Sequence, residues 1–235
     1  MMRLMATIGC DIRLQARNGF YYAAGFVAFF WMLMLSQVPA AYLAWLIPVF
    51  VLSNLLINTF YFIAGLVLLE KGEGTLLAQS VTPLRSWEYL AAKAITLTLL
   101  SLLENLLIVG VGYGLAFDLL PLLAGIVLAA TIFALTGFIV VSRYDSINEY
   151  LFPSFLYTLA FIPPFLDYLG LWQSRLVYLH PVQAPLLLTK AAFGPIATWQ
   201  WLYGLLYAAL WLGLLFGWSR RAFARFVMMA EGAGG

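Results

Sequence analysis

Between Arg17 and Glu70 the chain reads NGFYYAAGFVAFFWMLMLSQVPAAYLAWLIPVFVLSNLLINTFYFIAGLVLL over residues 18–69, with no Asp, Glu, Lys or Arg. A membrane-spanning helix needs about 20 apolar residues, so this run is long enough for two. Gln37-Val38-Pro39 is a natural break, because proline interrupts a helix. We therefore predict two spanning helices, over Phe20–Ser36 and Ala41–Leu69.

The rest of the chain has the same character. Of its 235 residues, 64% are hydrophobic and only 9% are charged, whereas soluble domains carry about 25% charged residues. A soluble fold of this composition would expose large apolar patches, so a soluble enzyme, a nucleic-acid binder and a disordered chain are excluded. Further spans are predicted over Leu90–Phe117, Leu122–Val141, Tyr150–Leu169 and Trp199–Trp218. Pro153 and Pro163-Pro164 are expected to kink or break the span over Tyr150–Leu169. Residues 1–235 thus form one all-α polytopic membrane domain with six transmembrane helices.

The charges orient this domain. In a six-span topology all but Arg175 and Lys190 of the twelve Lys and Arg residues fall on one side. The positive-inside rule then places both termini in the cytoplasm and the long, rather apolar stretch 170–198 outside. Cys10 is the single cysteine and His180 the single histidine, which excludes an internal disulfide and a multi-cysteine or multi-histidine metal site.

The first 18 residues predict an amphipathic helix lying in the membrane interface. At about 100° per residue one face is apolar and the opposite face carries arginines. The apolar face holds Met1, Leu4, Met5, Ile8 and Ile12, and the basic face holds Arg3, Arg13 and Arg17. The alternative is a simple basic flank that sets the orientation of the first span.

The loop at 70–89, between the second and third spans, is the most informative stretch. Gly72 and Gly74 allow a sharp exit from the membrane, and Thr75 is placed to cap a short helix ending near Gln79. Thr82-Pro83 ends that helix, and Ser86 is placed to cap the next long one with Glu88 in its first turn. Such a short helix at the membrane surface suits docking to a soluble partner. The alternative is an ordinary charged loop.

Three short motifs in this loop resemble those of the type-2 ABC exporter permease family. They are Glu70-Lys-Gly-Glu-Gly-Thr-Leu, Val81-Thr-Pro-Leu and Trp87-Glu-Tyr-Leu. With Phe60-Tyr-Phe and Tyr178-Leu-His-Pro-Val-Gln, the whole pattern is similar to the small bacterial permeases named for fluoroquinolone export.

The resemblance implies a half-transporter in the bacterial inner membrane. Two copies would form the pathway for a small amphipathic molecule or drug, and each would engage a separate ABC ATP-binding subunit that holds ATP and Mg²⁺. This chain would carry no cofactor and no enzyme activity of its own, since none of its three lysines lies in the Gly-Lys-Ser/Thr of a phosphate-binding loop. The residues matched to coupling with the ATPase are Glu70, Glu73, Gly74, Thr75, Leu76, Leu77 and Gln79. The substrate, the direction of transport and the choice between homodimer and heterodimer stay open.

Several polar residues lie inside predicted spans. Glu104 is near mid-span, where a charge costs about 2.5–3.5 kcal/mol or more. The candidate translocation path comprises Asn54, Asn58, Ser101, Glu104 and Asn105. One alternative is that these groups only hydrogen-bond helices together. Two others give Glu104 a different function, in a proton-coupled secondary transporter or an intramembrane enzyme.

Overall fold

The computed structural model describes residues 2–74 and 85–232, and every secondary-structure element within these ranges is a helix. Thr75, Leu76, Leu77 and Gln79 of the predicted coupling segment lie outside the described residues. The helices are α1 (Met2–Arg17), α2 (Phe20–Ser36), α3 (Ala40–Leu55), the π-helical η1 (Leu56–Tyr61), α4 (Phe62–Gly72), α6 (Ser86–Gly112), α7 (Leu119–Val141), α8 (Ile147–Leu159), α9 (Ile162–Tyr168), the 3₁₀ helix η2 (Arg175–Leu179), α10 (Gln183–Ala191) and α11 (Thr198–Gly232).

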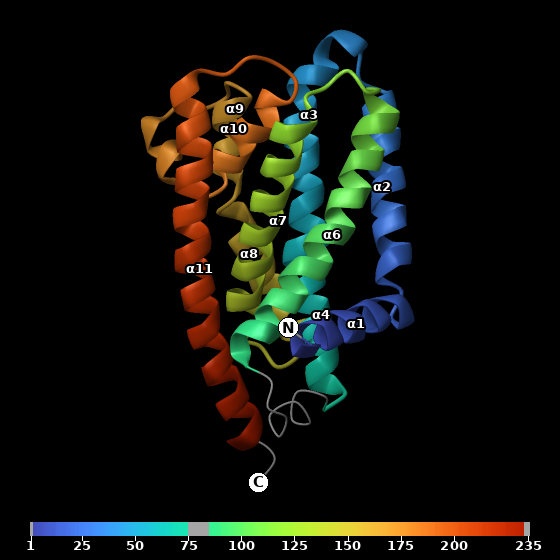
Figure 1. The fold of residues 1–235 in the computed structure, drawn as a ribbon, viewed down its shortest axis with the longest axis vertical. Helices are drawn as coiled ribbons and strands as arrows, with labels where there is room; N and C mark the ends of the chain where they lie inside the picture. Colours follow the sequence, from blue (N-terminus) through green and yellow to red (C-terminus); the bar gives the residue numbers. More distant parts are fainter. Residues whose placement is uncertain (1, 75–84, 233–235) are drawn as a thin grey trace.

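Four of the described helical stretches are long and apolar enough to cross a membrane. They are Ala40–Gly72, which joins α3, η1 and α4, then Ser86–Gly112, Leu119–Val141 and Thr198–Ala224. The pair α1 and α2 adds a fifth if it is read as one span bent by 68°. Figure 1 shows α2, α3, α6, α7 and α11 running along the bundle and α1 lying across its lower end.

The helix α2 has the bounds that the sequence predicts, but other elements differ. The region 150–169 is two helices, which confirms the break expected at Pro163-Pro164: these prolines at the start of α9 lack the N–H donors that would continue α8. Pro153 lies inside α8 and does not end it. The helix α6 ends at Gly112 and not near 117, while α11 continues past 218 to Gly232. Ser86 is the first residue of α6 rather than its cap, and Glu88 Oε2 accepts the backbone N–H of Arg85 at 2.9 Å.

The helix α7 is the centre of the bundle and contacts α3, η1, α4, α6, α10 and α11. Glycines permit these close approaches, as is common between membrane helices. A Cβ on Gly137 would lie 2.7 Å from the carbonyl oxygen of Phe60 in η1, and a Cβ on Gly125 would lie 2.8 Å from the backbone nitrogen of Thr189 in α10. The bundle therefore packs backbone to backbone around α7.

The helix α10 is buried between α7 and α11 in the upper half of the molecule (Figure 1). The stretch predicted as an external loop thus contains an inserted helix. His180, just before it, bonds the break between α8 and α9: its Nε2 lies 2.9 Å from the carbonyl oxygen of Ala160, and its Nδ1 accepts the N–H of Val182. Phe161 at the same break packs against Phe60 and Phe133.

Candidate functional site

The loop that the sequence singles out leaves the bundle at the C-terminal end of α4. Glu70 and Glu73 lie at the end of α4, and Gly74 follows with φ +67°, a left-handed conformation that glycine adopts without strain. The chain returns at Arg85, where the Glu88 carboxylate satisfies one of the free N–H groups that begin a helix. The two ends of segment 75–84 are therefore held by α4 and α6.

A buried cluster of charges joins these two helices to α1. The Lys93 ammonium on α6 lies 2.7 Å from Glu70 Oε1 on α4 and 3.1 Å from Asp11 Oδ1 on α1. The Tyr89 hydroxyl donates to the other Glu70 oxygen at 2.6 Å. Lys93 is 0% exposed, and Asp11 and Glu70 are each 3% exposed. We call Asp11, Glu70, Tyr89 and Lys93 the buried charge cluster.

Burial dominates the electrostatics of this cluster. It raises the pKa of Asp11 above its ordinary value, although the Lys93 ammonium acts in the opposite direction. One turn further along α1, Gln15 is fully buried and its Nε2 donates to Thr96 Oγ1 on α6 at 2.9 Å. Asp11 and Gln15 of α1 therefore face protein, while Met5 and Ile12 of its predicted apolar face are exposed.

Two ion pairs surround the same exit at the surface. Arg17 at the end of α1 contacts both carboxylate oxygens of Glu73, at 2.8 and 3.0 Å. Lys71 pairs with Asp145 in the turn between α7 and α8. Because these groups are partly exposed, each pair contributes little free energy, but together they connect four helices around the loop.

Of the predicted polar residues inside the spans, Asn54, Asn58 and Glu104 are joined across two helices, and Ser101 and Asn105 are bonded to each other on α6. Asn58 Nδ2 donates to Asn54 Oδ1 at 3.2 Å and also to Glu104 Oε2. Asn105 Nδ2 donates to the carbonyl oxygen of Ser101 at 2.7 Å. All five residues are at least nine-tenths buried, and Asn58 lies in η1, a π-helical insertion of the kind often found at functional sites. We call this group the mid-span polar cluster.

Hydrogen-bonding capacity is left over in the mid-span polar cluster. Five buried atoms lack a partner among the described residues, namely Asn54 Nδ2, Asn58 Oδ1, Ser101 Oγ, Glu104 Oε1 and Asn105 Oδ1. No Lys, Arg or His in the described ranges forms an ion pair with Glu104. Unsatisfied buried polar groups are costly, so such a set suits water, a proton or a polar ligand group.

The comparisons with known proteins agree with this architecture. The model of the fluoroquinolones export permease protein family matches residues 2–231. The chain belongs to this family. It is 34% identical over 235 residues to the fluoroquinolones export permease proteins of Mycobacterium tuberculosis strains CDC 1551 / Oshkosh and ATCC 25618 / H37Rv, with 99% of each chain covered. No solved structure matches.

The sequence missed three of the four residues of the buried charge cluster in this permease. Glu70 was expected at the coupling turn, but Asp11, Tyr89 and Lys93 were not assigned a function. The available signal was that Lys93 falls just inside a predicted span, where a charge needs a partner of opposite sign. Asp11 is 82 positions away in sequence, and no local pattern identifies it as that partner.

The single histidine of the permease, His180, is held in place by backbone groups. Its two ring nitrogens contact backbone groups, and burial lowers the pKa of His180 below its ordinary value. Within the described residues no three His, Cys, Asp or Glu side chains gather where they could hold a metal ion.

Proposed function

We propose that this permease is the membrane subunit of an ATP-driven exporter and is moved by a separate ATP-binding chain. The family and the names of its relatives support export. In this proposal the partner binds ATP and Mg²⁺, two permease copies enclose the pathway, and this chain catalyses no reaction. The relatives' names make fluoroquinolones the first compounds to test.

The proposed topology has six spans in the bacterial inner membrane with both termini in the cytoplasm. The 17 residues of α2 are enough for one short span when α1 lies flat in the interface. The broken pair α8 and α9 would form the fifth span, since α8 exposes large apolar side chains along its length. The strong bias of Lys and Arg toward one side supports this orientation.

The observation that carries the proposal is the buried charge cluster beside the loop. A force applied at segment 75–84 reaches the membrane only if the helices on both sides of the segment move with it. Lys93 holds Glu70 on the preceding helix and Asp11 on the interfacial helix. A push by the ATPase would therefore move α1, α4 and α6 as one body and open the cavity between two permease copies.

The test is a pull-down of the tagged permease from its native membranes in mild detergent, with the ATPase activity of the bound chains measured. The variant carries Gly74→Ala, Thr75→Ala and Leu76→Ala. The matched control replaces Gly194, Pro195 and Ile196, in the turn before α11 at the other end of the bundle, by alanine. We expect a stoichiometric ATPase that only the first variant releases or uncouples. A permease that exports its substrate with no ATPase bound would refute the proposal.

The environment of Glu104 favours one second candidate, a proton-coupled secondary transporter. The carboxyl is buried, contacts Asn58 and has no cationic partner in the described residues. Proteoliposomes of the permease alone distinguish the two functions. Substrate movement driven by a pH gradient without ATP, and lost in Glu104→Gln, would favour the second candidate. The ATP-driven exporter predicts no substrate movement in this assay, either for the wild-type permease or for Glu104→Gln.

A further inference from the structure

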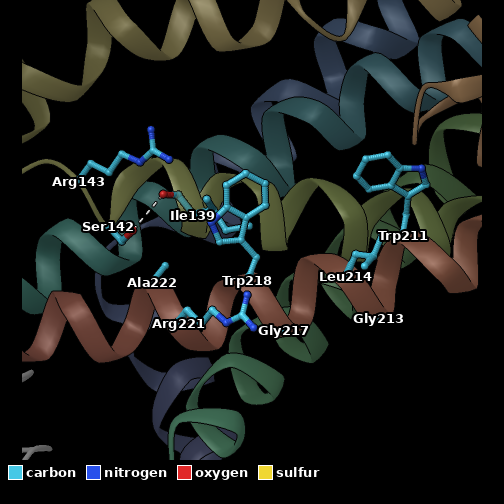
Figure 2. A pocket seen from close by; sticks show the side chains of 10 residues that line it. All are labelled: Ile139, Ser142, Arg143, Trp211, Gly213, Leu214, Gly217, Trp218, Arg221 and Ala222. Carbon is cyan, nitrogen blue, oxygen red and sulfur yellow. Dashed lines mark hydrogen bonds between the residues drawn. The ribbon is translucent and has the colours of Figure 1, made fainter. Parts of the chain in front are cut away.

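A groove of about 610 Å³ runs between the C-terminal end of α7 and the middle of α11. Figure 2 shows the indole of Trp218 lying between the two helices, with Arg143 beyond the end of α7 and Arg221 on α11. The groove lies toward the lower end of the bundle, where α11 carries its cluster of arginines. It shares no residue with the buried charge cluster or the mid-span polar cluster.

The apolar part of the groove reaches the backbone of α11. Gly213 and Gly217 are one turn apart and both line it. No heavy atom lies within 4 Å of the position that a Cβ would take at either glycine. Trp211 and Leu214 form its walls at the same level. This space is long, open and apolar, which suits a flexible hydrocarbon chain.

The polar end of the groove is positively charged. Arg143 and Arg221 are both exposed there, and within the described residues neither forms an ion pair with a carboxylate. The one side chain bonded to Arg143 is the Tyr157 hydroxyl, at 3.4 Å. Trp218, which is 53% exposed, lies beside them. Arginine and tryptophan together near the end of an apolar span, here Thr198–Ala224 in α11, are typical of the headgroup layer.

We propose that this groove binds an anionic phospholipid from the leaflet on the side of the two termini. One acyl chain lies along Gly213 and Gly217, and the phosphate accepts hydrogen bonds from the guanidinium groups of Arg143 and Arg221. Arginine is suited to this contact because its planar donors match phosphate oxygens. The site does not require the proposed export function, only that the permease is in a membrane.

A second copy of the chain is a poorer occupant of the groove. A two-fold contact at this surface would place the arginines of one copy against the same arginines of the other, since both sides of such an interface are identical. Four guanidinium groups would then meet with no carboxylate from the groove itself between them. A lipid phosphate supplies the missing negative charge, and Trp218 then stays in the headgroup layer of the membrane.

Native mass spectrometry of the full-length permease tests the proposal. The permease in mild detergent is mixed with phosphatidylglycerol, or with phosphatidylethanolamine that has the same acyl chains. The bound lipid is measured after the protein is released from the detergent in the mass spectrometer. Removing one basic residue near the surface weakens binding of an anionic lipid about fivefold. The double variant Arg143→Gln, Arg221→Gln should thus lose about 25-fold in phosphatidylglycerol affinity. It should lose less toward phosphatidylethanolamine, which has the same phosphate but no net negative charge. Arg220→Gln, next to Arg221 but outside the groove, is the matched control and should bind like the wild type.

A second variant tests the apolar part of the site. Gly217→Leu places an uncharged side chain in the groove, at a position where an added Cβ meets no neighbour, so it should displace phosphatidylglycerol while Arg143 and Arg221 remain. Equal binding of the two lipids, or equal loss in Arg220→Gln, would overturn the proposal. Displacement of the lipid by millimolar inorganic phosphate would show a free-phosphate site instead. Efficient disulfide formation between copies of Cys10→Ser, Gly217→Cys in membranes would show that a second copy occupies the groove.

Discussion

Replacing Lys93 by methionine should be the most damaging single change at the end of the bundle that carries α1. Methionine keeps the length and the apolar stem of the side chain but removes the ammonium from between Asp11 and Glu70. Both carboxylates are 3% exposed, so neither gains water in exchange. Leaving one partner of a buried ion pair uncompensated costs about 3–5 kcal/mol.

The expected loss is large enough to measure in detergent. For a chain of 235 residues, about 3–5 kcal/mol lowers the melting temperature by roughly 6–20 °C. Tryptophan fluorescence during heating reports this shift. Arg17→Met is the matched control, because it removes the exposed pair with Glu73, worth about 0–1 kcal/mol, and should shift the melting temperature by only a few degrees.

A triple variant separates charge from packing. Lys93→Met combined with Asp11→Asn and Glu70→Gln contains no buried charge in the cluster, and replacing a whole buried ion pair by neutral groups is often nearly neutral for stability. We expect it to recover most of the stability lost in Lys93→Met. Two results would contradict this reasoning. Either Lys93→Met has the same melting temperature as Arg17→Met, or the triple variant is no more stable than Lys93→Met. In both cases the uncompensated charges do not cause the loss of stability.

Two further predictions concern packing and protonation. Gly137→Ala should destabilise the bundle by about 1–3 kcal/mol through overpacking, because its Cβ would meet the Phe60 carbonyl oxygen at 2.7 Å. The control in the same thermal assay is Gly25→Ala, whose Cβ would have no neighbour within 4 Å. The folded state lowers the pKa of His180, so the unfolded chain binds more protons in acid and stability should fall as the pH drops below about 6.5. His180→Asn should flatten this part of the profile of melting temperature against pH, and an unchanged profile would show that His180 does not cause the acid loss.

The spans were predictable where lipid is the main solvent. The absence of charge over residues 18–69 and the Gln37-Val38-Pro39 break place α2 at its observed bounds, because a spanning helix is specified by composition and length. Tyr150–Leu169 was less clear, since its prolines indicate that the helix is disturbed without fixing where. The structure locates the break at Ala160 and Phe161, where the carbonyl of Ala160 is bonded by His180, a residue 20 positions away.

The polar sites were predictable only in part, because local sequence does not specify contacts between residues that are distant along the chain. The spacing of Asn54 and Asn58, and of Ser101 and Asn105, places each pair on one helix face. Which faces meet depends on the packing of η1 against α6 and α7, which no local pattern encodes. Asp11 illustrates the limit: a carboxylate on a basic amphipathic helix is typical of a solvated face, yet α1 turns it onto Lys93.

The two buried polar clusters together determine which helices can move. Lys93 and Glu104 are three turns apart on α6, about 16 Å, and each bonds to the chain of α3, η1 and α4, through Glu70 and through Asn58. Two attachments at different depths prevent this pair of helices from sliding or pivoting against each other without breaking buried polar contacts. In the proposed exporter, motion started at segment 75–84 would therefore be taken up elsewhere. The broken α8 and α9, and the lipid-exposed side of α11, have no comparable buried charge among the described residues.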